Sequence, residues 1–166
     1  KDIEAAKAKG VKQSLIDRLA LTEQRIEDMA EGLRYGISIC VAGATSSGKT
    51  TLAGWLLTTI PDNKRIFTIE NGSRELALVR EKDGKVTNSV IHTLTRFSEN
   101  EKQNIDQDML LDMALRFNPE IICVGEMRSS EAYTAQESAR TGHTVLTTIH
   151  SNSCESTYSR MRTLCK

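Results

Sequence analysis

The residues with the most specific chemistry lie in one segment, which reads Gly43-Ala44-Thr45-Ser46-Ser47-Gly48-Lys49-Thr50. This is a complete G-x-x-x-x-G-K-[ST] phosphate-binding loop. Its glycines permit backbone conformations that a Cβ would forbid, so the loop N–H groups can surround phosphate oxygens. Lys49 can reach the β- and γ-phosphates of a nucleotide, and the Thr50 hydroxyl is placed to ligate Mg²⁺. We therefore expect residues 43–50, with the following Thr51, to bind ATP and Mg²⁺.

The residues around this loop place it between a strand and a helix. The run 37–42 precedes it and is apolar and β-branched, as buried parallel strands are. Residues 51–57 follow it and can form a helix. In this context the motif binds phosphate, because a helix N-terminus directs free N–H groups at the anion.

Three glutamates are candidates for metal binding and catalysis. Glu126 ends the apolar run 121–126, where an acid can hold Mg²⁺ through water or polarise the attacking water. Glu70 and Glu75 flank the turn after the run 65–70, so one could act as general base while the other positions Mg²⁺. Each carboxylate could instead form a local ion pair at the surface. We expect all three in the site, with the general base open between Glu70 and Glu75.

Two histidines and one arginine complete the set of candidates. His143 and His150 bracket the run 144–149, and a histidine at a strand tip can donate a hydrogen bond to a γ-phosphate. A packed or surface imidazole is the alternative for each. Arg116 could neutralise phosphate charge within the site or across a subunit interface. Equally, it could be a solvated cation at a helix end.

From residue 35 onward, strand and helix signals alternate along the chain. The predicted strands cover residues 37–42, 65–70, 90–94, 121–126 and 144–149, and the predicted helices cover 51–57, 105–117, 130–140 and 153 onward. This alternation favours an α/β fold with a mostly parallel sheet and helices on both faces. Ligands bind at the carboxyl ends of such strands, so the loop, Glu70, Glu126 and His150 should meet there.

Two further segments have a different character. Residues 1–34 repeat apolar side chains at helical spacing among many charges, which predicts an amphipathic helical segment with a break near Gly10. Residues 73–88 are polar and end in Lys82-Asp83-Gly84-Lys85, which predicts a surface loop or hairpin.

The bulk composition narrows the classes of function. The chain has 166 residues, enough for one domain with a substantial core, and equal numbers of basic and acidic residues, 22 each. This balance does not indicate a nucleic-acid surface. No apolar run is long enough to span a membrane, and no secretory signal precedes the fold. The four cysteines lack C-x-x-C spacing, so we expect neither a zinc site nor disulfides, as in a reducing cytoplasm.

Four blocks stand in a fixed order: GATSSGKTT, RIFTIENGSREL, NPEIICVGEMRSSEAYTAQESARTGH and VLTTIHSNSCESTYSRM. Over about residues 36–163 they resemble the secretion ATPases of type II and type IV secretion and of type IV pilus machines, most of all the type IV secretion and conjugation branch. The resemblance implies a RecA-like core and a homo-hexameric ring that hydrolyses Mg-ATP to drive secretion, conjugation or pilus assembly. It also implies a cytoplasmic protein, peripheral at the inner face of the cell membrane, working with secretion or pilus machinery.

In that family the four blocks are the phosphate loop, an acidic box, the second nucleotide motif and a histidine box. The resemblance assigns Lys49 and Thr50 to phosphate and Mg²⁺, Glu126 to the second motif, and Arg116 to a family arginine. Glu70 and Glu75 fall in the acidic box, and His143 and His150 in the histidine box. Where the acidic box usually reads I-E-D, this chain has Asn71 and one extra residue, which leaves the general base open.

Residues 1–34 do not resemble the N-terminal domain that caps the nucleotide in this family. They are similar to the N-terminal helical region of γ-glutamyl phosphate reductase. We therefore expect two parts: a helical segment 1–34, foreign or misjoined, and a truncated C-terminal ATPase core 35–166. One alternative is a nucleotide-binding module without turnover, because the capping domain is missing. A reductase fragment is the other, although no G-x-G-x-x-G supports a dinucleotide site.

Overall fold

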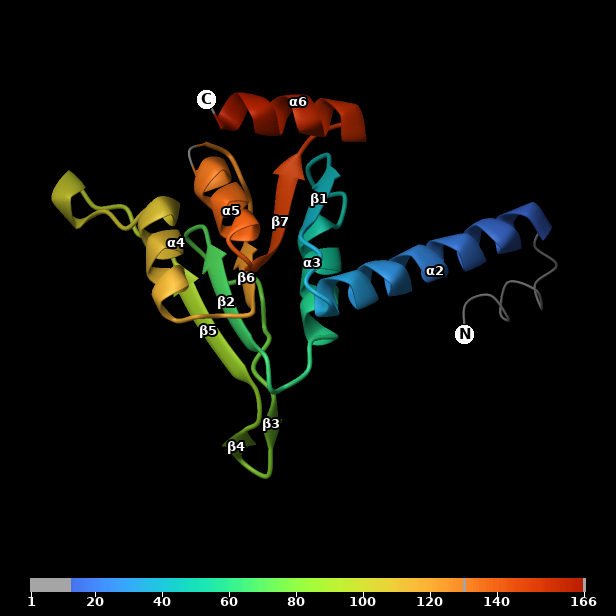
Figure 1. Ribbon diagram of the computed structural model, residues 1–166, viewed down its shortest axis with the longest axis horizontal. Helices are drawn as coiled ribbons and strands as arrows, with labels where there is room; N and C mark the ends of the chain where they lie inside the picture. The colour runs from blue at the N-terminus through green and yellow to red at the C-terminus, as the bar shows by residue number, and fades with distance from the viewer. Residues whose placement is uncertain (1–12, 130, 166) are drawn as a thin grey trace.

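A single parallel sheet forms the centre of the computed structural model, which describes residues 13–129 and 131–165 (Figure 1). Its strands are β1 (Ile39–Gly43), β2 (Arg65–Glu70), β5 (Ser89–Leu94), β6 (Ile121–Val124) and β7 (Thr144–His150). They are arranged in the order β1-β7-β6-β2-β5, and every neighbouring pair is parallel. The inner strands β2, β6 and β7 are almost entirely buried, which explains their continuous apolar sequences.

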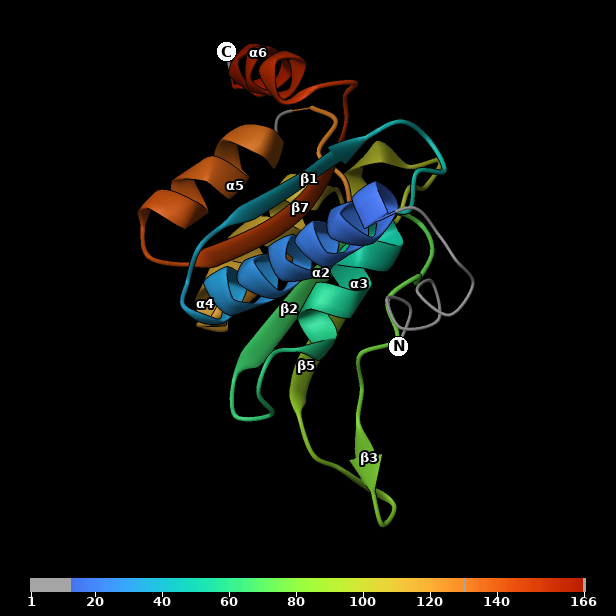
Figure 2. The ribbon, with the colours of Figure 1, turned by 90° about the vertical axis from the view of Figure 1, so that its right-hand side faces the viewer.

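Helices cover both faces of this sheet, as the sequence predicted (Figures 1 and 2). On one face lie α2 (Gln13–Arg34) and α3 (Lys49–Thr58), and on the other α4 (Gln107–Arg116) and α5 (Glu131–Arg140). The last helix, α6 (Cys154–Leu164), lies across the end of the sheet where β7 finishes. The fold is therefore the predicted α/β architecture.

The sheet separates two hydrophobic layers. In the first, Leu33 of α2 and Leu56 and Leu57 of α3 are buried against the sheet. In the second, Leu111 of α4 is fully buried with Phe67 of β2 among its core neighbours. Both faces of the inner strands are thus removed from water, which fixes the position of the strand ends where ligands bind.

The segment between β2 and β5 is more ordered than its polar sequence predicted. The predicted hairpin is confirmed as β3 (Glu81–Lys82) and β4 (Lys85–Val86), joined by Asp83 and Gly84. Both turn residues have positive φ, 52° and 71°, as the preferred two-residue hairpin turn requires. Residues 76 and 78, however, are leucines buried in the same layer as α3. The short helix η1 (Glu101–Gln103) precedes α4, and the predicted break near Gly10 lies outside the described residues.

Replacing Leu33 with alanine tests whether α2 is part of this core. The Leu33 side chain is 1% exposed, and Leu21 on the same helix is 51% exposed. We expect Leu33→Ala to lower the free energy of unfolding by about 2–5 kcal/mol, because it removes buried methyl groups and leaves a cavity. The matched control Leu21→Ala should change it by less than about 0.5 kcal/mol. Urea denaturation measures both, and equal values for the two variants would contradict the packing of α2.

Candidate functional site

A cleft of about 350 Å³ opens at the carboxyl ends of the strands, and we name it the carboxyl-end cleft. It brings together six of the predicted site residues, drawn from the loop, the ends of three strands and the segment after β2: Lys49, Thr50, Glu70, Glu75, Glu126 and His150. Thr45 and Ser46 of the loop also line it. The parallel sheet places these side chains together because all five strands end at this edge.

The glycine-rich loop has the shape of an anion-binding site. Gly48 precedes α3 with φ 85°, and Ser46 has φ 60°, so the chain turns sharply before the helix begins at Lys49. Glycine adopts this left-handed conformation without the penalty that a Cβ imposes. Successive loop N–H groups and the positive end of α3 can then face the same bound anion.

Lys49 is held inside its own loop. Its Nζ atom donates a hydrogen bond of 2.7 Å to the Ala44 carbonyl and lies 3.5 Å from Nδ1 of His150. The carbonyl and the imidazole thus hold the ammonium group where the loop curves. A phosphate entering the loop would replace these partners as the acceptor of the Lys49 hydrogen bonds.

Glu126 contacts two side chains, His150 and Arg128, through its two carboxylate oxygens. Its Oε1 atom lies 3.0 Å from Nε2 of His150, and its Oε2 atom accepts a hydrogen bond of 2.5 Å from Arg128. Partial burial would raise the pKa of Glu126, but the Arg128 hydrogen bond and the charges of Arg128, His150 and Lys49 outweigh burial and lower it. The carboxylate is therefore held ionised, as a group that binds Mg²⁺ through water must be.

The tip of β6 is fixed by hydrogen bonds that motif spacing could not reveal. Gly125 approaches β2 closely, and a Cβ there would lie 3.2 Å from the Ile69 carbonyl. Its own carbonyl accepts a hydrogen bond of 2.7 Å from the hydroxyl of Thr148 on β7. Gln107 of α4 donates to the Glu126 carbonyl at 3.2 Å. Neighbouring elements thus hold the backbone that carries Glu126.

Glu131 was not among the predicted site residues, yet it shapes the segment beside Glu126. Although buried, its carboxylate accepts hydrogen bonds from the N–H groups of Arg128 and Ser129 and from the Ser129 hydroxyl. Burial alone would raise the pKa of Glu131, and these hydrogen bonds lower it. Glu131 therefore fixes the turn from which Arg128 reaches Glu126.

The two glutamates of the acidic box have different surroundings. Glu70 is 4% exposed, and its Oε2 atom accepts hydrogen bonds from the N–H groups of Glu75, at 2.6 Å, and Leu76, at 2.9 Å. Glu75 is exposed and lines the cleft, and its carboxylate makes no hydrogen bond within the described part of the chain. One carboxylate is committed to the backbone, and the other is available to a ligand.

Trp55 lines a neighbouring groove of about 380 Å³ on the outer side of α3, together with Thr51 and Glu75. Its side chain is 45% exposed. Thr51, the last residue predicted for the loop motif, therefore faces this groove and is not among the residues that line the carboxyl-end cleft.

His143 and Arg116 lie outside the carboxyl-end cleft, so the structure does not bring these two predicted residues together with the others. The alternative role of Arg116, at a subunit interface, stays a prediction. His143 precedes β7 and His150 ends it, so seven extended steps along the chain separate their Cα atoms by roughly 23 Å. Arg116 ends α4 next to Phe117, whose carbonyl accepts a hydrogen bond from Arg65, the first residue of β2. Both residues thus lie at the edge where the strands begin.

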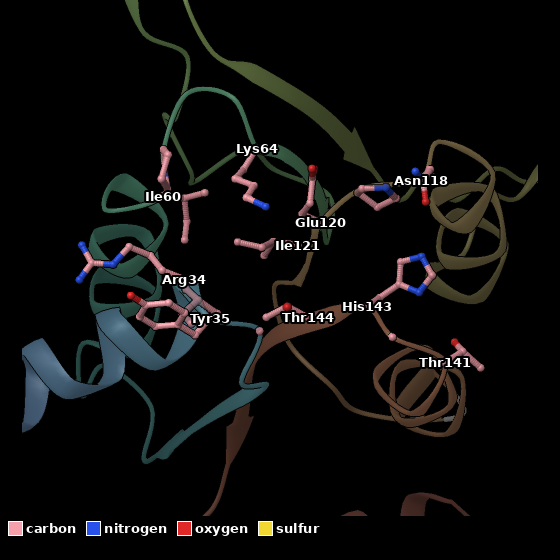
Figure 3. Close-up of a pocket in the computed structure, with 15 residues that line it drawn as sticks. Arg34, Tyr35, Ile60, Lys64, Asn118, Glu120, Ile121, Thr141, His143 and Thr144 are labelled. Carbon is pink, nitrogen blue, oxygen red and sulfur yellow. The ribbon is translucent and has the colours of Figure 1, made fainter.

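His143 instead lines a second cleft, of about 530 Å³, which we name the amino-end cleft (Figure 3). Lys64 points into it, and Glu120 and Tyr35 lie around it. The Nδ1 atom of His143 is buried without a hydrogen-bond partner among the described residues. A packed imidazole, the alternative given for His143, describes this position better than a group at a γ-phosphate.

A parallel α/β sheet, with a phosphate loop after β1 and an acid two residues beyond the end of β6, defines the class of the protein: a RecA-like nucleotide-binding fold. The family follows from the sequence. The chain belongs to the family described as type II/IV secretion system protein, whose family model matches residues 6–166. The resemblance of the four motif blocks to secretion ATPases is thereby confirmed.

Individual relatives agree with this family. The type IV secretion system protein PtlH of Bordetella pertussis is 35% identical over 134 residues, which cover 80% of this chain and 38% of PtlH. The crystal structure of the VirB11 ATPase from the Brucella suis type IV secretion system, in complex with sulphate, matches with a TM-score of 0.68 and 29% identity. That match covers 98% of this chain and 41% of VirB11.

The ATPase DotB of Legionella pneumophila gives a TM-score of 0.64 at 29% identity, covering 83% of this chain and 37% of DotB. The chain thus spans less than half the length of PtlH, VirB11 and DotB. The family match begins at residue 6, and the separate origin of residues 1–34 stays a hypothesis. In the part of the chain that the structure describes, no helix has both the length and the apolar character of a membrane span.

Proposed function

We propose that the chain binds Mg-ATP in the carboxyl-end cleft and hydrolyses it. The observation that carries this proposal is the convergence of Lys49, Thr50, Glu126 and His150 on one cleft beside the phosphate loop. The loop and the N-terminus of α3 would receive the phosphates, and Lys49 would neutralise their charge. Membership of a family with ATPases such as VirB11 and DotB supports the same reading.

The oxygen atoms at this site suit Mg²⁺. Mg²⁺ is typically held by one or two protein oxygens, by phosphates and by water, without a complete protein cage. The Thr50 hydroxyl and the Glu126 carboxylate are such ligands, with Glu126 acting partly through water. No group of three or more His, Cys, Asp or Glu residues that could hold a metal occurs among the described residues, so the remaining ligands would come from ATP and water.

Glu75 is the better of the two candidates for the general base. A general base must have a free carboxylate within reach of the water whose proton it accepts. Both oxygens of Glu70 have hydrogen-bond donors nearby, whereas the Glu75 carboxylate is exposed at the cleft. Glu70 then serves to hold the segment that carries Glu75.

His150 is placed to couple the loss of the γ-phosphate to movement. It lies between Lys49 and Glu126, within 3.5 Å of the first and 3.0 Å of the second. A bound γ-phosphate would compete for the same contacts, so His150 and the following helix α6 would respond to its presence. In the whole protein, this response would drive secretion, conjugation or pilus assembly in a homo-hexameric ring at the cytoplasmic face of the membrane.

Binding without turnover is the second candidate, and one observation favours it. Arg128 is the only arginine of the described residues that lines the carboxyl-end cleft, and it is already paired with Glu126. Besides the loop lysine, phosphoryl transfer in P-loop enzymes commonly uses an unpaired arginine as a further cation that stabilises charge in the transition state. A neighbouring subunit would have to supply this cation, so hydrolysis should depend on assembly.

The rate of phosphate release as a function of protein concentration distinguishes these candidates. For a ring motor, we expect the rate per mole of protein to rise with concentration and to level off when assembly is complete. A constant, measurable rate would contradict the need for a neighbour. No release at any concentration, with ATP binding still detected by calorimetry, would establish binding without turnover for this chain.

A further inference from the structure

Beside the carboxyl-end cleft, Thr68 of β2 and His92 of β5 form a buried polar pair that none of the proposed roles uses. Nδ1 of His92 lies 2.9 Å from the Thr68 hydroxyl and 3.6 Å from Oε1 of Glu70. Thr68 is fully buried, and the His92 side chain is 11% exposed. The two strands are parallel neighbours with Thr68 opposite His92, so the contact is fixed by the sheet register.

The direction of these hydrogen bonds follows from the chemistry of the acceptor. A carboxylate only accepts hydrogen bonds, so the Thr68 hydroxyl donates to Oε1 of Glu70, at 3.5 Å. The hydroxyl oxygen then accepts from Nδ1–H of His92. Burial lowers the pKa of His92, Arg74 lowers it further and Glu70 opposes both. A neutral imidazole with its proton on Nδ1 fits this arrangement.

The other oxygen of Glu70 holds the segment that carries Glu75. Oε2 accepts from the N–H groups of Glu75 and Leu76. A continuous chain of hydrogen bonds therefore runs from His92 through Thr68 and Glu70 to the backbone of Glu75. The buried strand β2 and the half-buried edge strand β5 are thus connected to an exposed segment that follows β2.

We propose that His92 and Thr68 are positioning residues, which orient the Glu70 carboxylate and through it place the backbone of Glu75 at the cleft. The kinetic consequence rests on the proposed function, in which Glu75 is the general base. The structural consequence does not, because the N–H groups of Glu75 and Leu76 are held by Glu70 whether or not ATP is hydrolysed. Loss of the donor on His92 leaves the Thr68 hydroxyl free to turn away from Glu70, which then holds these two N–H groups less firmly.

The test compares four variants of the chain, three single and one double, by amide hydrogen exchange. In His92→Leu the donor is lost, and in His92→Asn the side-chain amide keeps a donor at the position of Nδ1. We expect exchange of the Glu75 and Leu76 amides to become about tenfold faster in His92→Leu, the factor expected for one hydrogen bond to a charged group. His92→Asn should restore most of the protection. Thr68→Val should resemble His92→Leu. The double variant with both substitutions should differ little from either single variant, because each substitution alone already interrupts the series of hydrogen bonds.

The same variants are then assayed with Mg-ATP. We expect kcat to fall about tenfold in His92→Leu while the ATP dissociation constant changes less than twofold, because the loop and Lys49 are untouched. Unchanged exchange at Glu75 and Leu76 in His92→Leu would overturn the proposal. Equally faster exchange throughout the sheet would also overturn it, since His92 would then support only general stability. Local loss of protection in a chain without any ATP turnover would retain the positioning role and reject the proposed function.

Discussion

Replacing Lys49 with alanine is expected to weaken Mg-ATP binding and hydrolysis by about 100-fold or more. Fixed charges aimed at a reacting anion contribute about 100- to 1,000-fold each when removed singly. Lys49 is the only lysine among the described residues that lines the carboxyl-end cleft, so no other lysine of that cleft can replace its charge. Isothermal titration calorimetry measures the dissociation constant, and phosphate release measures turnover.

Lys64→Ala is the matched control for this experiment. Lys64 points into the amino-end cleft, at the opposite edge of the same sheet (Figure 3). The Lys64→Ala substitution removes the same charge from the chain but leaves the phosphate loop intact. The ATP affinity of this variant should therefore stay within about twofold of that of the parent chain. Equal losses in the two variants would show a general electrostatic effect. Undiminished binding in Lys49→Ala would refute nucleotide binding at the loop.

Replacing Glu126 with glutamine should separate binding from hydrolysis. The amide keeps the size of the side chain but removes the negative charge that faces His150 and Arg128. We expect kcat to fall by about 100-fold or more, within the range that acid–base and electrostatic groups contribute. ATP should still bind to the loop, so the dissociation constant should change much less than kcat.

A surface glutamate provides the comparison for Glu126. Glu137 on α5 pairs with Arg140 three residues later, and both are exposed. Glu137→Gln should leave kcat within about twofold, because an exposed pair contributes little and lies outside the cleft. Normal turnover in Glu126→Gln would exclude Glu126 from the reaction. Loss of ATP binding in Glu126→Gln would instead show that Glu126 contributes to binding ATP in the ground state.

Much of the fold could be predicted because buried parallel strands have an unambiguous sequence. The run 65–70 was predicted with the bounds of β2 because its central residues are mostly apolar and it lies between Pro61 and Gly72. In the structure every residue of this strand after Arg65 is buried. The convergence of Lys49, Glu126 and His150 followed from the direction of parallel strands. Both the strand bounds and the convergence of these residues depend on the order and direction of the strands, which short sequence patterns predict well.

The side chains that act through the backbone could not be predicted in this way. Glu131 and Thr148 were missed because their partners are N–H and carbonyl groups of other segments, which leave no spacing pattern. His143 was grouped with His150 because both flank one strand. The extended strand between them, however, places the two histidines at opposite edges of the sheet. The extra residue before Glu75 left the general base open, and the two glutamates differ in the structure by the burial and the hydrogen bonds of Glu70.

The position of Trp55 makes the site optically observable without a label. It is the only tryptophan in the sequence, so tryptophan emission of the chain arises solely in the groove that it shares with Thr51 and Glu75. Its half-exposed indole lies on the helix that begins at Lys49. A shift of the segment that carries Glu75 would change the polarity around the ring. Any shift of this segment on nucleotide binding would therefore be visible in the emission spectrum of the unmodified protein.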